Sequence, residues 1–148
     1  MYKKLLPVLL LLCFFTGCFS YGPFKANTQV VEGIVLLDGE PIADAIIKFV
    51  PSEESKETGE LATGLTNANG KFDLTSLYGN RGRGALQGTY KVIVSKEKSD
   101  WVIDKRTGEG YTVATQLLPA IYQDETKTPL EVTVKKGKNK VTLELQSK

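Results

Sequence analysis

Apolar and polar residues alternate at period two through most of this chain from residue 30 onward, in short runs that end at turn residues. No stretch of comparable strength repeats at the helical period of 3.6 residues. Alternation at period two places every second side chain on the same face of a strand, so that one face can pack on a core. The pattern therefore predicts an all-β fold.

The clearest expected strand is 89–96, in which Tyr90, Val92 and Val94 share one face. In the first strand Val31 and Val35 point inward, with Gly33 between them at a position that a neighbouring backbone or ring can approach closely. The same reasoning predicts inward-facing side chains at Ala45, Ile47, Phe49, Phe72, Leu74, Leu130, Val132, Val134, Val141, Leu143 and Leu145.

Two turns are expected to close hairpins. Segment 67–70, Asn-Ala-Asn-Gly, stands between the runs 61–66 and 71–74, and Asn and Gly tolerate the positive φ of a tight turn. Segment 136–139 joins the last two strands into a C-terminal hairpin. Seven short strands with such spacings, and no helical crossover, favour a seven-stranded, antiparallel, Greek-key β-sandwich of two layers.

The N-terminus is typical of an export signal. Residues 1–4 form a basic head, and the apolar run 5–15 is too short to cross the roughly 30 Å hydrocarbon core of a membrane. Small residues precede Cys18, and the site resembles the lipobox of bacterial lipoproteins, in which the cysteine is diacylated and becomes the mature N-terminus. The alternatives are a secretory signal cleaved near Ser20 or Gly22 and a short uncleaved anchor.

These observations divide the chain into a lipoprotein signal peptide (1–17), a tether (18–28) and a sandwich domain (29–148). If Cys13 leaves with the signal, the mature chain keeps one cysteine and forms no internal disulfide.

Acyl chains on Cys18 would anchor the domain to a membrane of the bacterial cell envelope, and two or three chains make such an anchor effectively permanent. The residues after it, Phe19 and Ser20, lack the Asp that retains some lipoproteins at the inner membrane. We therefore expect the periplasmic face of the outer membrane.

Histidine is absent from the sequence, which excludes catalytic triads, histidine-activated cysteines and histidine-ligated metals. Without Lys3 and Lys4 of the signal, basic and acidic residues balance, so charge gives no reason to expect nucleic acid as a partner. The carboxylates of 53–60 lie in a polar stretch, where a solvated loop is favoured over a glycosidase pair. No enzyme activity and no cofactor are expected.

Five segments share a pattern with a known family: 31–35, 38–42, 45–49, 66–72 and 88–92. Together they resemble the carboxypeptidase regulatory-like domain, and the likeness covers most of 30–145. Segments 117–122 and 128–130 look like the small envelope lipoproteins of planctomycete-type bacteria that consist of this domain. The resemblance implies a prealbumin-like, transthyretin-like β-sandwich. Its motifs are turn and core positions, which specify fold far better than function.

The segment 97–128 is the one long passage that a sandwich does not explain, and connections of this length are usually functional or disordered. Trp101 could stack on a sugar ring or on an aromatic partner, with Tyr111 nearby. The alternative is that Trp101 and Tyr122 close one edge of the sandwich. Arg81 and Arg83 give a glycine-rich loop a basic tip.

Four lysines, Lys135, Lys136, Lys138 and Lys140, surround the last turn. We expect them to protect strand edges from mispairing, with contact to anionic lipid or polymer as the alternative.

The sequence thus leads to two hypotheses. The first is a non-enzymatic, lipid-anchored envelope β-sandwich that acts as a structural or protein-interaction module, with a protein or polysaccharide of the envelope as its partner. The second is a carbohydrate-binding module that uses the loop around Trp101 and Tyr111.

Overall fold

The computed structural model describes residues 27–55, 59–77 and 82–148, and this part of the chain is built almost entirely of strands. It contains eleven strands rather than seven, because several short segments pair over only two or three residues. The expected all-β fold is confirmed. The expected signal peptide (1–17), Cys18 and Arg81 lie outside the described residues. Within these residues no helix has the length and apolar character needed to cross a membrane.

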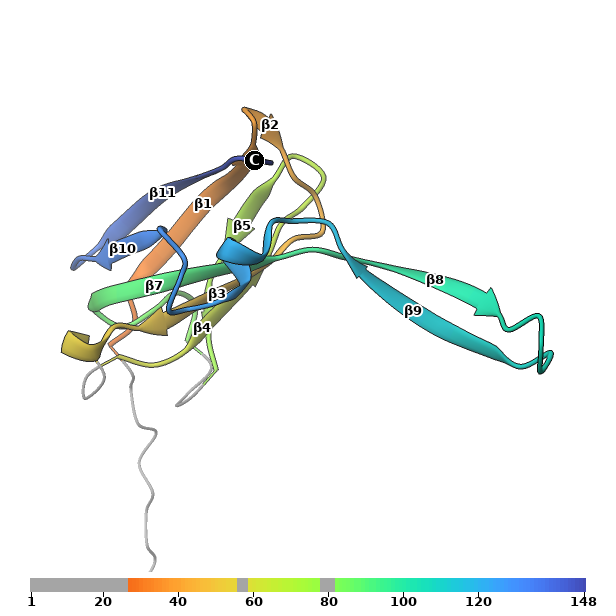
Figure 1. Ribbon diagram of the computed structural model, residues 1–148. Helices are drawn as coiled ribbons and strands as arrows, with labels where there is room; N and C mark the ends of the chain where they lie inside the picture. Colours follow the sequence, from red (N-terminus) through yellow and green to blue (C-terminus); the bar gives the residue numbers. More distant parts are fainter. Residues whose placement is uncertain (1–26, 56–58, 78–81) are drawn as a thin grey trace, which may run out of the picture.

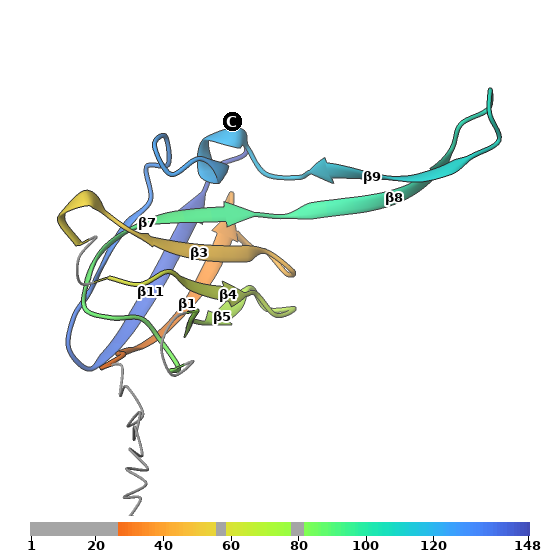
Figure 2. The ribbon, with the colours of Figure 1, turned by 90° about the horizontal axis from the view of Figure 1, so that it is seen from below.

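Two sheets face each other across a shared core (Figures 1 and 2). The four-stranded sheet contains β1 (Val30–Leu37), β2 (Glu40–Pro41), β5 (Lys71–Asp73) and β11 (Lys138–Leu145). The five-stranded sheet contains β3 (Ile46–Pro51), β4 (Ala62–Leu65), β6 (Thr75–Ser76), β7 (Gly88–Ser95) and β10 (Glu131–Val134). Two 3-10 helices, η1 (Glu53–Ser55) and η2 (Ala120–Gln123), lie in the connections.

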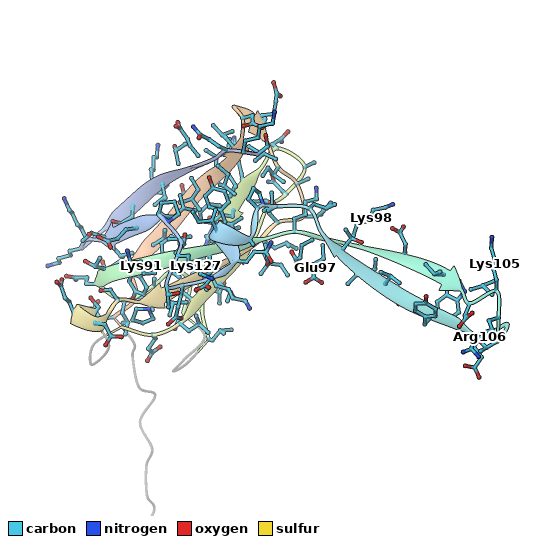
Figure 3. The ribbon with its side chains drawn as sticks, in the orientation of Figure 1. Lys91, Glu97, Lys98, Lys105, Arg106 and Lys127 are labelled. Carbon is cyan, nitrogen blue, oxygen red and sulfur yellow. The ribbon has the colours of Figure 1, made fainter. Side chains whose placement is uncertain are left out.

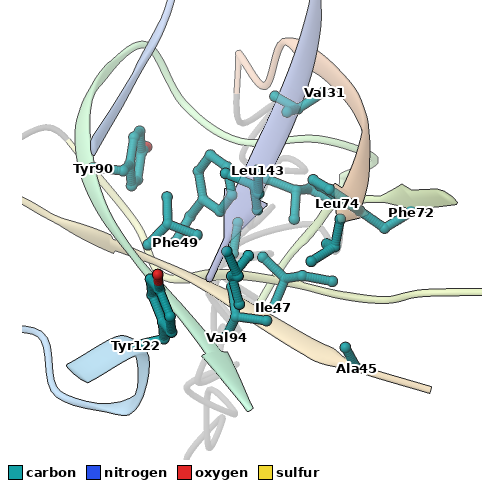
Figure 4. Close-up of a cluster of buried hydrophobic side chains, with 14 of the residues drawn as sticks. Val31, Ala45, Ile47, Phe49, Phe72, Leu74, Tyr90, Val94, Tyr122 and Leu143 are labelled. Carbon is teal, nitrogen blue, oxygen red and sulfur yellow. The ribbon is translucent and has the colours of Figure 1, made fainter. Parts of the chain in front are cut away.

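The core is made by the alternating residues of both sheets (Figure 4). Val31 and Val35 face inward from β1, and Phe49 and Tyr90 face them from the other sheet with ring centroids 5.8 Å apart. The predicted inward positions are buried or half-buried throughout. The Tyr90 hydroxyl donates to the Leu86 carbonyl (2.9 Å), and burial raises the pKa of the phenol.

The two expected hairpins are wrong, although both turns exist. Strands β4 and β5 flank the turn at 67–70 but belong to different sheets, and so do β10 and β11. The Asn67 side chain closes the first turn by accepting the Asn69 N–H (2.9 Å), and Gly70 has a positive φ of 69°. Both turns therefore carry the chain across the sandwich, which lets the apolar face of each strand reach the same core.

The sheets are not purely antiparallel. β11 lies parallel to β1 along eight residue pairs, from Val30 with Lys138 to Leu37 with Leu145. Parallel neighbours cannot be joined by a tight turn, so the last strand reaches the first only after the chain has crossed from the other sheet. This pairing joins the two ends of the described domain.

Candidate functional site

A third sheet stands apart from the sandwich. Strands β8 (Glu97–Ile103) and β9 (Gly110–Gln116) pair only with each other among the described residues, and every residue of both strands is exposed. Figures 1 and 2 show this hairpin continuing the direction of β7 away from both sheets. We call residues 97–116 the arm.

Hydrogen bonds hold the arm at both ends. At the base the Leu117 N–H donates to the Lys96 carbonyl (2.8 Å), and at the tip the Asp104 N–H donates to the Glu109 carbonyl (2.9 Å). Gly108 completes the tip with a positive φ of 75°. Figure 3 shows Lys105 and Arg106 at this distal end, far from Lys91 and Lys127 on the body.

Beyond the arm the chain docks back on the core. Leu118 and Tyr122 are buried, and the Tyr122 hydroxyl accepts the Gln146 N–H (3.0 Å). The pKa of the nearby Asp124 is lowered to about 2, because its carboxylate accepts hydrogen bonds from Thr126 and pairs with Lys127. These contacts fix the base of the arm on the sandwich.

The arm exposes apolar side chains on both of its faces. Opposite residues in an antiparallel pair share a face, so Trp101, Ile103 and their partners Thr112 and Gly110 lie on one side. Val102, Tyr111 and Val113 lie on the other. The exposed fractions are 69% for Trp101, 60% for Ile103 and 51% for Tyr111. Exposed apolar groups gathered in this way are typical of interaction sites.

The structure corrects two expectations about these rings. Tyr122 is buried as expected for an edge-closing residue, but Trp101 is far from closing the sandwich because the arm carries it into solvent. Trp101 and Tyr111 also do not form one surface, since the register places Tyr111 opposite Val102 on the other face. Trp101 packs instead across Gly110, and its ring occupies the space that a side chain there would need.

No protein-family model matches this chain. A search of curated proteins also finds no match. Among solved structures the chain is similar to the crystal structure of a "putative carbohydrate binding protein" from Pseudomonas aeruginosa, at 16% sequence identity and a TM-score of 0.38. The likeness covers 79% of this chain and 88% of that chain.

Arg83, the other predicted site residue that is described, lies on the sandwich and not in the arm. Its Nη2 atom is 3.2 Å from Asp73 Oδ2, and both side chains are largely exposed. The pair borders a surface hollow of about 520 Å³ beside β5, which Lys71 and Leu65 also line. An exposed ion pair of this kind contributes about 1 kcal/mol or less, so Arg83 is explained by local structure.

Of the lysines near the last turn, Lys138 and Lys140 lie on β11, which is an edge strand. Lys138 Nζ is 3.0 Å from Glu32 Oε1 on the neighbouring β1. Within the described part of the chain, no three acidic or cysteine side chains come close enough to hold a metal ion.

Sequence reasoning missed Val102, Ile103 and Val113 as members of the site. A signal for the hairpin was present, since two β-prone runs flank the turn residues 104–109, which include Gly108. Neither run alternates cleanly between apolar and polar residues, however, because neither strand buries a face against the sandwich.

Proposed function

We propose that the protein is a non-enzymatic binding module of the bacterial cell envelope, in which the β-sandwich is a rigid platform and the arm contacts a partner protein. The arm carries this proposal because it presents apolar side chains on both faces, and residues 27–55, 59–77 and 82–148 leave these side chains exposed. Covering both faces requires a partner that surrounds or extends the hairpin. Trp, Tyr and Arg, which Trp101, Tyr111 and Arg106 supply, are the residues that most often dominate protein interfaces.

The proposal includes the family resemblance and its finer fold, a prealbumin-like Greek-key sandwich of the carboxypeptidase regulatory-like type. It is supported by the positions that carry the resemblance. Val35, Phe49, Phe72 and Val92 are all buried core residues, and segment 67–70 forms a turn.

The proposed anchor is a diacylated Cys18 at the periplasmic face of the outer membrane. Its support is the sequence of the export signal, and the described domain begins only a short tether later. Because acylation needs the thiol of this residue, Cys18→Ser should abolish incorporation of a fatty-acid probe in cells. Cys13→Ser is the matched control and should keep the label, since Cys13 leaves with the signal. Label that persists in Cys18→Ser would refute the anchor.

A carbohydrate ligand is the second candidate. The indole of Trp101 is held across Gly110 and remains largely exposed, which is a suitable arrangement for stacking on a sugar ring. Because Tyr111 lies on the other face, only one ring of this pair could meet a given sugar surface.

Crosslinking separates the two candidates. With p-benzoylphenylalanine in place of Val102, irradiation of cells should yield a discrete protein adduct, because this position lies in the centre of the apolar part of the arm. The same group in place of Lys48, exposed on the sandwich, should give none. The carbohydrate function would be favoured if no adduct forms at 102 and if envelope polysaccharide binds the wild type but not Trp101→Ala. Absence of both signals would contradict both functions.

A further inference from the structure

The two edges of the arm offer open backbone groups. The hydrogen bonds at the two ends of the hairpin are made by even-numbered residues on the β8 side: Lys96, just before β8, bonds to Leu117, and Asp104, just after β8, bonds to Glu109. Because the direction of the backbone groups alternates along a strand, the N–H and C=O of Ser99, Trp101 and Ile103 point away from β9. Open edges of this kind are templates for a further strand.

The charges of β8 and the start of the following turn are arranged symmetrically about Trp101. Glu97 lies four residues before it and Lys105 four after it, while Lys98 lies three before and Asp104 three after. In an antiparallel pair of two such strands centred on Trp101, Glu97 would stand opposite Lys105 of the other strand and Lys98 opposite Asp104, while Asp100 would face the uncharged Val102. The segment is therefore complementary to itself.

We propose that β8 pairs antiparallel with β8 of a second copy of this chain, with the two-fold axis at Trp101. The proposal deepens the proposed function and rests on it, since it names the partner of the arm. The backbone N–H and C=O of Trp101 bond to the C=O and N–H of Trp101 in the second copy. Ser99 pairs in the same way with Ile103 of the second copy. The result is a four-stranded sheet in the order β9, β8, β8, β9.

Charge selects this register over its neighbours. A shift of the pairing by two residues in one direction places Asp100 opposite Asp100 of the second copy. The same shift in the other direction places Asp100 opposite Asp104 and Lys98 opposite Arg106. Like charges directly opposite each other are unfavourable. Over the same residues the pairing centred on Trp101 has one like-charge contact, Lys96 opposite Arg106, against two attractive ones, Glu97 with Lys105 and Lys98 with Asp104.

The pairing also brings the most exposed apolar side chains of β8 against side chains of the second copy. Directly opposite residues share a face, so Trp101 lies beside its counterpart and Ile103 beside Ser99 of the second copy. A two-stranded hairpin without a core is marginal in water, and four strands are more stable. Strand β9 carries no charged residue that could select a register, so its edge is the weaker candidate.

Two proline variants at one ladder position test the edge. Ser99 and Ala114 face each other in the arm, and the N–H of each points outward, so neither substitution removes a β8–β9 hydrogen bond. Light scattering of the full chain in detergent should show a dimer for the wild type and for Ala114→Pro. Ser99→Pro should raise the dimer Kd about 100-fold, because it removes two symmetry-related hydrogen bonds and places a ring in the interface.

A charge exchange tests the register. Lys105→Glu should raise the Kd about tenfold by facing Glu97 of the second copy, and the double variant Glu97→Lys, Lys105→Glu should restore it. Thermal unfolding of each variant checks that the domain still folds. Any one of three results would overturn the proposal. The wild type could be monomeric, the dimer could be lost in Ala114→Pro but not in Ser99→Pro, or the double variant could dimerise as weakly as Lys105→Glu.

The adduct formed from position 102 separates this proposal from the proposed function. An adduct of twice the chain mass supports both the protein-binding function and the second copy as the partner. A discrete product of another mass, with a monomeric purified chain, overturns the second copy as partner and leaves the proposed function standing.

Discussion

Phe49→Ala is expected to lower the free energy of unfolding by about 3–5 kcal/mol, the usual cost of removing a large buried aromatic side chain. Phe49 is 0% exposed and lies on β3, in the middle of the five-stranded sheet. Its ring contacts that of Tyr90 at a tilt of 49°, and Figure 4 shows it among side chains from both sheets. Strands β4 and β7 flank it through Ala62 and Val92, so the cavity cannot close by a simple movement of one edge.

The neighbouring residue supplies the control for this prediction. Lys48 is on the same strand but points to solvent, so Lys48→Ala should change stability by no more than about 0.5 kcal/mol. Chemical denaturation of both variants measures the difference. A cost below about 1 kcal/mol for Phe49→Ala would mean that the two sheets do not pack on this ring.

Period-two alternation was sufficient to predict which side chains form the core. Tyr90, Val92 and Val94 are buried as expected, because a strand with one apolar face can satisfy that face only by turning it inward. The same alternation does not indicate which strands are neighbours in a sheet. It could not show that β10 pairs with β7 while β11 pairs with β1.

The turn at the C-terminal end illustrates this difference. Asn139 accepts the Lys135 N–H (2.9 Å) and donates to the Lys135 carbonyl (2.8 Å), as it could in a hairpin. The Gly137 N–H, however, donates to the Gln29 side chain (2.7 Å) at the start of the domain. This long-range contact belongs to the tertiary structure and has no local sequence signal.

The arm was the least predictable part for a physical reason. Sequence patterns detect strands through burial, and the described part of the chain buries neither face of the arm. Its apolar residues therefore lack the period-two pattern by which a core-facing strand is recognised. Core strands are specified by alternating apolar residues. In the proposed dimer, β8 is specified instead by the symmetric charges about Trp101, because these favour pairing with a second strand of the same sequence.

Gly33→Ala should lower the free energy of unfolding by about 3 kcal/mol, at the upper end of the usual cost of overpacking a core. A Cβ atom there would lie 2.6 Å from the Val141 carbonyl oxygen and would overlap the Phe72 ring. That carbonyl belongs to the parallel β1–β11 ladder, so it cannot withdraw without breaking the pairing that joins the two ends of the domain.

The cost at Gly33 should be steric, which a matched pair of variants can show. Gly137 has a positive φ of 101° but nothing within 4 Å of a new Cβ, so Gly137→Ala should cost only about 1 kcal/mol, from backbone conformation. Shortening the opposing ring in the double variant Gly33→Ala, Phe72→Leu should recover part of the loss, with a coupling energy of at least about 0.5 kcal/mol in a double-mutant cycle. Strictly additive costs would mean that Phe72 does not pack against Gly33, and that the close approach of β5 to β1 is not what requires glycine at this position.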